Sequence, residues 1–114
     1  MSQCIDYDNL DLLKSVIGKD LKSILESYLK ITPDVLDKLR EAIAQKNDHD
    51  VQHYAHTLKG SSSNIGAIEV PAVSLKLEDM GRHGKLDQAE VVYAELQDAY
   101  QRLTVAIADY IQKI

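Results

Sequence analysis

The sequence lacks tryptophan and phenylalanine and has a single cysteine, Cys4, and each shortage excludes a class of protein. With six tyrosines but no tryptophan or phenylalanine, stacking platforms for nucleic-acid bases are not expected. One cysteine cannot form a disulfide within the chain, which is typical of a reducing compartment. Five glycines and two prolines are too few for a linker or a low-complexity tract.

Long apolar runs and excess positive charge are also missing. No apolar stretch approaches the roughly 20 residues that span a bilayer. The acidic N-terminus, MSQCIDYDNLD, does not have the basic and apolar regions of a signal peptide. Acidic residues outnumber basic ones by 18 to 13, for a net charge of −5, which argues against a protein that neutralises nucleic-acid phosphates. We therefore expect a soluble, cytoplasmic protein that binds neither membranes nor nucleic acid.

Apolar residues recur at helical spacing along the chain, and no segment alternates like a strand. The expected helices cover residues 7–16, about 20–45, about 48–65, about 70–81 and from after Asp87 to Ile114. Pro33 interrupts the second stretch, which leaves either one kinked helix or two abutting helices with Pro33 in the first turn of the second.

Four of these helices are long and amphipathic, and short loops join them. The second carries an apolar face of Leu21, Ile24, Leu25, Tyr28 and Leu29. The last carries a seam of apolar residues spaced three and four apart, from Val92 to Ile114. We predict an all-α fold, an antiparallel up-down-up-down four-helix bundle with the short N-terminal helix capping one end, as a single domain over residues 1–114. We further expect a free-standing monomer.

The segment AHTLKGSSSNIGA, residues 55–67, does not resemble an ordinary end of a helix. At about 100° per residue, a buried face centred on Leu58 places His56 about 160° away, on the solvent side. Lys59 and Ser63 flank the histidine, and Gly60 lies one turn beyond it. An ordinary exposed face carries Glu, Lys, Gln or Arg, so Gly60 and Ser63 remove bulk beside an imidazole at a cost in helix propensity.

Small side chains beside an exposed histidine favour chemistry in which another molecule approaches the ring. Neutral imidazole prevails at pH 7 and offers a lone pair as a nucleophile. Phosphoryl transfer to a ring nitrogen needs an in-line approach and stabilisation of charge, which the ammonium group of Lys59 can supply. The alternatives are a histidine satisfied in the core, which the helical phase disfavours, and a surface histidine without a role.

At these residues the segment resembles the signature of histidine-containing phosphotransfer (HPt) domains of multistep phosphorelays. The shared pattern is a histidine, the triplet Leu-Lys-Gly, small residues, and an ending of an apolar residue, Gly and Ala. The stretches LESYLKITPDVLDKLREAIAQKND and LKLEDMGRHGKLDQA are similar to the family's second and fourth helices. The family often has alanine where this sequence has Ser62 and Ser63, a difference that we expect to be tolerated.

The resemblance implies that His56 accepts a phosphoryl group on Nε2 from a receiver-domain aspartate and passes it to another receiver. Lys59 would hold the phosphoryl group or steer the donor, and Gly60 with Ser63 would leave room for the partner. Glu78, 22 residues after the histidine, would hydrogen-bond the other ring nitrogen, although by sequence alone a solvated helix glutamate is an equal alternative.

The same resemblance implies a carrier without kinase activity. It implies no cofactor of its own, because Mg²⁺ belongs to the receiver-domain partner. The expected partners are receiver domains of response regulators and hybrid sensor kinases.

Two other functions remain open from the sequence. His49, His53 and His56 recur on one outward face at spacings that can bind zinc, but the pattern lacks the glutamate of a zinc protease, and we predict no metal site. A helical adaptor that binds a signalling partner without phosphorylation would leave the small residues beside His56 unexplained.

Overall fold

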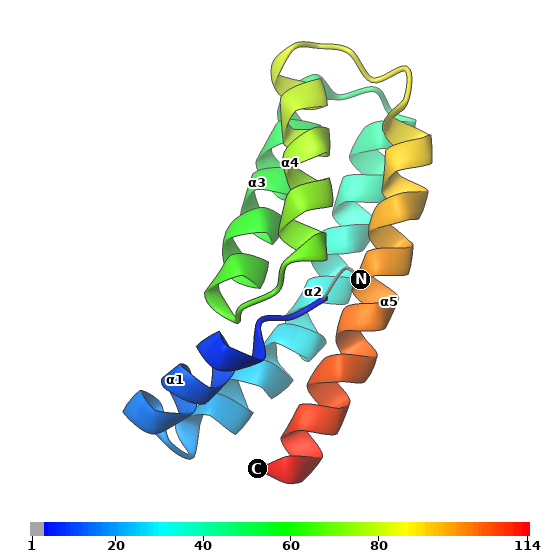
Figure 1. The fold of residues 1–114 in the computed structure, drawn as a ribbon. Coiled ribbons are helices and arrows are strands. Elements are labelled where there is room, and N and C mark those ends of the chain that lie inside the picture. The colour runs from blue at the N-terminus through cyan, green and yellow to red at the C-terminus, as the bar shows by residue number, and fades with distance from the viewer. Residues whose placement is uncertain (1–3) are drawn as a thin grey trace.

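The computed structural model describes residues 4–114, which form five α-helices joined by short connections (Figure 1). Their bounds are α1 Tyr7–Ile17, α2 Asp20–Ala44, α3 Asp48–Asn64, α4 Glu69–Arg82 and α5 Ala89–Lys113. Each lies within a residue or two of the range expected from the sequence, and the described residues contain no strand. The all-α prediction is confirmed.

The α2 helix runs without interruption through Pro33, which decides between the two interpretations of this stretch in favour of one helix. Proline removes one backbone N–H from the helical ladder. The neighbouring Thr32 is buried and donates its hydroxyl to the Tyr28 carbonyl oxygen at 2.6 Å, one turn back. The helix continues to Ala44, and its buried residues extend from Leu21 to Ile43.

The four long helices close into a bundle in which α2 packs on α3 and α5, and α4 packs on α3 and α5. Short connections make consecutive helices antiparallel, as Figure 1 shows. The core contains one apolar cluster to which every helix contributes. The seam of α5 is buried as predicted from Val92 to Tyr110, but its last predicted residue, Ile114 at the end of the helix, is 37% exposed. Ile24 of α2, also expected on an apolar face, is 46% exposed. Ile24 lies at the edge of the apolar face of α2, where the bundle does not cover it.

The α3 and α4 helices are in close backbone contact at Gly81. A methyl group built at Gly81 would lie 2.6 Å from the Gln52 backbone nitrogen and 2.7 Å from the Asp48 carbonyl oxygen. No side chain fits there, so the glycine permits the two backbones to meet. This contact sets the distance between the helices that carry the residues discussed below.

The short α1 helix covers the end of the bundle at which α3 ends and α4 begins, beside α2 and the C-terminal half of α5 (Figure 1). The Asp6 backbone N–H donates to the Gly66 carbonyl oxygen at 2.7 Å, which ties the start of α1 to the α3–α4 connection. On the other side, the Tyr110 hydroxyl donates to Asp11 at 3.0 Å. The predicted capping position of the N-terminal helix is confirmed.

No helix in the described part of the chain is both long and apolar enough to cross a membrane.

Candidate functional site

The α3 helix holds the histidine of the motif on its outward face. Asn47 caps the start of the helix, because its side chain accepts a hydrogen bond from the Asp50 backbone N–H and so satisfies a free donor of the first turn. Its inward face consists of Val51, Ala55, Leu58 and Ser62, all buried. As the helical phase predicted, the His56 side chain is 67% exposed.

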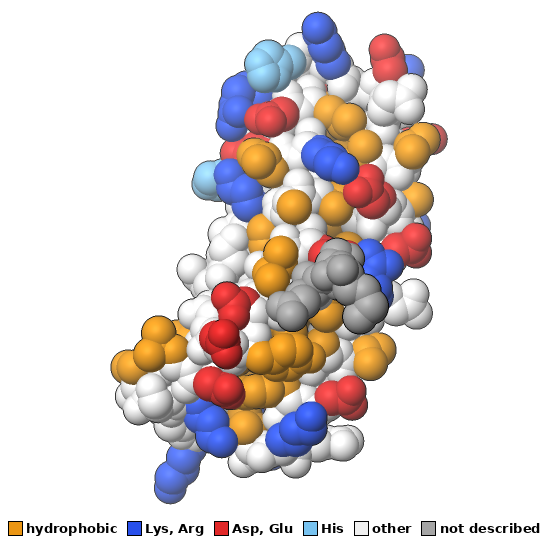
Figure 2. Space-filling model, viewed as in Figure 1, with side chains coloured by type: hydrophobic (Ala, Val, Ile, Leu, Met, Phe, Trp, Pro, Cys, Tyr) orange, Lys and Arg blue, Asp and Glu red, His pale blue; other side chains and the backbone are white. Residues whose placement is uncertain are grey.

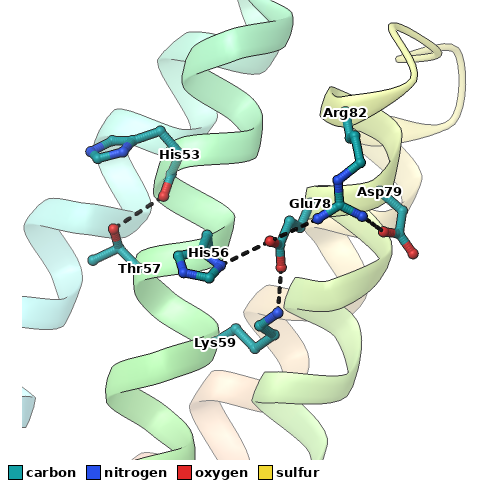
Figure 3. Close-up of polar contacts among 7 residues, drawn as sticks. All are labelled: His53, His56, Thr57, Lys59, Glu78, Asp79 and Arg82. Carbon is teal, nitrogen blue, oxygen red and sulfur yellow. Dashed lines mark hydrogen bonds and ion pairs between the residues drawn. The ribbon is translucent and has the colours of Figure 1, made fainter.

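Glu78 of α4 meets His56 across the gap between the two helices (Figure 3). Its Oε2 lies 2.8 Å from Nδ1 of His56, so an Nδ1–H donates to the carboxylate when that nitrogen carries the proton. Lys59 Nζ approaches the other oxygen, Oε1, to 2.6 Å, as an ion pair. The sequence left open whether Glu78 was a solvated helix residue, and the structure shows it buried at 4% side-chain exposure.

The charge of Glu78 is stabilised although the carboxylate is buried. Burial by itself would raise the pKa of Glu78, but the contacts with Lys59 and His56 outweigh it and hold the pKa below its usual value of 4.5. Arg82, one turn further along α4, adds a second cation, with Nη2 3.1 Å from Oε2. At neutral pH the carboxylate is therefore an anion that only accepts hydrogen bonds.

An acceptor at Nδ1 determines which ring nitrogen of His56 can react. A neutral imidazole carries one proton, and a carboxylate beside Nδ1 stabilises the form in which that proton is on Nδ1. The lone pair is then on Nε2. In Figure 3 the ring lies between α3 and α4 with Nδ1 toward Glu78, and no described residue forms a polar contact with Nε2.

Gly60 and Ser63 lie on the exposed side of α3, as expected. A methyl group built at Gly60 would have no neighbour within 4 Å, so nothing inside the protein requires glycine at this position. Packing and backbone conformation explain Gly81 and Gly66, but they do not explain Gly60.

The two other histidines of α3 lie close to His56 without forming a metal site. An open depression on this face is lined by His49, Gln52, His53, His56, Glu78 and Arg82. Within residues 4–114, no group of three or more histidine, cysteine or acidic side chains is arranged to hold a metal ion. His49 instead lies beside Asp50, and His53 forms an edge-on ring contact with Tyr54.

The N-terminal helix also bears apolar residues at its surface. Leu12 and Val16 are 63% and 74% exposed, whereas Leu13 packs against the core. Figure 2 shows apolar side chains at the surface in the region of α1.

Two features of the site were missed from the sequence. Arg82 contacts both Glu78 and Asp79, and the signal was present in the spacing of four residues between Glu78 and Arg82 on one helix. Ser62 lies within 2.6 Å of the Tyr28 hydroxyl in the core, and burial raises the pKa of Tyr28 to about 12. A serine inside an apolar stripe was the available signal for this buried contact.

A model of the Hpt domain matches residues 23–106, most of the chain. The chain belongs to the Hpt domain family. This membership confirms the resemblance drawn from the histidine motif, and the matched range contains the motif, Glu78 and Arg82.

A curated relative of this Hpt domain is the phosphorelay intermediate protein rdeA of Dictyostelium discoideum, 30% identical over 87 residues. The match covers 76% of this chain and 34% of the relative, so the chain spans about a third of the relative's length.

Solved structures show the same fold at lower sequence identity. The histidine-containing phosphotransfer protein B of Pseudomonas aeruginosa superposes with a TM-score of 0.94 at 22% identity, covering 100% of this chain and 99% of that one. A histidine-containing phosphotransfer protein of Medicago truncatula gives a TM-score of 0.79 at 22% identity, covering 96% and 77%. These likenesses support the helical bundle described above.

Proposed function

We propose that this Hpt domain is a phosphocarrier that accepts a phosphoryl group on Nε2 of His56 from the aspartyl phosphate of one receiver domain and delivers it to another. The observation that carries the proposal is the pairing of Nδ1 with a buried, charged Glu78 on a ring that is otherwise exposed. This arrangement holds the reactive nitrogen outward with its lone pair available.

The transfer exchanges one bond for another. The Nε2 lone pair attacks phosphorus, the N–P bond forms, and the P–O bond of the acyl phosphate breaks to release the receiver's aspartate as a carboxylate. The proton on Nδ1 stays on the ring, where the positive charge that develops is stabilised by the Glu78 carboxylate. Return of the phosphoryl group to a second aspartate reverses these steps.

Lys59, Gly60 and Ser63 have supporting roles in the proposal. The ammonium group of Lys59 is one turn from His56 on a flexible stem and can move from Glu78 to the phosphoryl oxygens. Gly60 and Ser63 place no bulky side chain beside the ring, so that a receiver domain can bring its phosphoaspartate in line with Nε2.

The proposal requires no kinase activity, nucleotide, cofactor or metal of this protein's own, and Mg²⁺ would be supplied by the receiver domain. The partners proposed are receiver domains of response regulators and hybrid sensor kinases, met by a cytoplasmic monomer. The net charge of −5 supports a protein partner rather than nucleic acid.

Incubation with phosphorylated receiver domains and Mg²⁺, followed by intact-mass spectrometry, tests the proposal. The wild-type protein should gain one acid-labile, base-stable phosphoryl group, and His56→Gln should gain none. His53→Gln is the matched control, because His53 is an exposed histidine one turn earlier on the same helix and should not matter. No transfer from a broad panel of receivers to the folded wild-type protein would refute the proposal in favour of an adaptor.

A further inference from the structure

Arg82 is held at both sides of its guanidinium group. Nη2 lies 3.1 Å from Glu78 Oε2, and Nη1 lies 2.7 Å from Asp79 Oδ1 (Figure 3). A planar guanidinium with two carboxylate partners has little freedom to rotate. The oxygen that Arg82 contacts is also the oxygen that contacts Nδ1 of His56.

Lys59 is held differently. Its one polar contact in the described part of the chain is the ion pair with Glu78 Oε1, and its ammonium group ends a stem of rotatable bonds. The two cations thus divide the carboxylate between them, with Lys59 on Oε1 and Arg82 on Oε2. Of the two, Lys59 is the one that can leave.

The departure of Lys59 would leave Glu78 in need of a cation. The carboxylate is 4% exposed, and a buried anion without a cationic partner is strongly destabilised. Arg82 remains in place because Asp79, itself half exposed, keeps its second nitrogen occupied. Glu78 can therefore stay ionised, with Oε2 directed at His56, while Lys59 contacts the phosphoryl group.

We propose that Arg82, anchored by Asp79, is the positioning residue that keeps Glu78 Oε2 on Nδ1 of His56, both in the unphosphorylated protein and after Lys59 leaves Oε1 for the phosphoryl group. The inference rests on the proposed phosphocarrier function, but its structural half concerns the unphosphorylated protein. Arg82 acts through Glu78, so removing it should change both the tautomer of His56 and the rate of transfer.

The test compares Arg82→Gln, Arg82→Lys and Lys59→Ala with the matched control Lys76→Gln. Lys76 is also a cation of α4, but it pairs with Glu95 of α5, so its loss removes the same charge from the same helix at a different surface. Because the Arg82 and Lys76 side chains are about half exposed, the folded state should survive both substitutions, which thermal unfolding checks.

The first measurement is ¹⁵N NMR of the His56 ring without phosphorylation. Arg82→Gln should shift the ring toward the tautomer protonated on Nε2, and Arg82→Lys should restore part of the loss. Lys59→Ala and Lys76→Gln should leave the tautomer as in the wild type. An unchanged tautomer in Arg82→Gln would overturn the positioning role, because Oε2 would then be held without Arg82.

The second measurement is the rate of phosphoryl transfer from a phosphorylated receiver. Misplacement of the ring should slow Arg82→Gln roughly 10- to 100-fold relative to Lys76→Gln. A slowed transfer with an unchanged tautomer would overturn the proposal in favour of direct contact between Arg82 and the phosphoryl group. If the wild type accepts no phosphoryl group, the proposed function fails, whereas the tautomer comparison still decides whether Arg82 holds Glu78.

Discussion

Substitution of Gly60 should stabilise the fold and impair phosphoryl transfer at once. Gly60 lies inside α3, its backbone does not have the positive φ that favours glycine, and a methyl group there would have no neighbour within 4 Å. A glycine in the interior of a helix costs about 1 kcal/mol relative to alanine. The protein therefore gives up stability at this position without any gain in internal packing.

The size of the effect follows from the helix propensity and the chain length. Gly60→Ala should raise the free energy of unfolding by about 1 kcal/mol. For a domain of 114 residues, whose entropy of unfolding is about 2.1 cal/mol/K per residue, this corresponds to an increase in Tm of about 4 °C. Gly60→Gln should raise Tm almost as much, because glutamine is also a good helix former.

The two variants should differ in transfer. The glutamine side chain projects into the space from which a receiver domain would approach His56, and a loss of about 1.4 kcal/mol in docking slows the reaction tenfold. Gly60→Gln should therefore transfer at least about tenfold more slowly than the wild type, with Gly60→Ala between them. Thermal unfolding by circular dichroism and single-turnover transfer from a phosphorylated receiver measure the two effects separately.

Two outcomes would refute this reasoning. Wild-type transfer by Gly60→Gln would show that the low surface beside His56 is not needed for access. A decrease in Tm for Gly60→Ala would show that the backbone at residue 60 requires glycine after all.

Two further predictions concern α4. Gly81→Ala should lower the free energy of unfolding by about 1–2 kcal/mol, the opposite of the effect of Gly60→Ala. The new methyl group would overlap the α3 backbone at Gln52 and Asp48, and this overpacking outweighs the gain in helix propensity. An unchanged Tm in thermal unfolding would contradict this prediction. Because the folded-state pKa of Glu78 is lowered from 4.5, its charge adds stability that is present above pH 4.5 and is lost as the pH falls through the lower folded-state pKa. In urea unfolding, the difference in the free energy of unfolding between wild type and Glu78→Gln should therefore shrink below pH 4.5. A difference that is constant between pH 6 and pH 3 would show that the charge of Glu78 is not stabilised in the fold.

Much of this site could be predicted from local patterns because a helix converts sequence spacing into direction. The phase of α3 placed His56 outward and Leu58 inward, and both positions are observed. The number of helices and the capping position of α1 followed from apolar spacing and short loops in the same way. The unusual choice of Gly60 on an exposed face was visible without any coordinates, because helix propensity is a local property.

Contacts between helices were harder to predict from the sequence, because they depend on how two helices pack and not on the residue spacing within either helix. Sequence alone left Glu78 undecided between a solvated residue and a partner of His56, and only the packing of α4 against α3 buries it beside Nδ1. The same packing depends on Gly81, which the sequence analysis treated as the end of a helix and which instead permits the close contact with α3. It also brings Lys59 of α3 and Arg82 of α4 to one carboxylate. The sequence by itself determined the helices and the direction of the histidine, whereas the tertiary structure decided which charges surround it, since a charge network requires side chains from two helices to meet within about 3 Å.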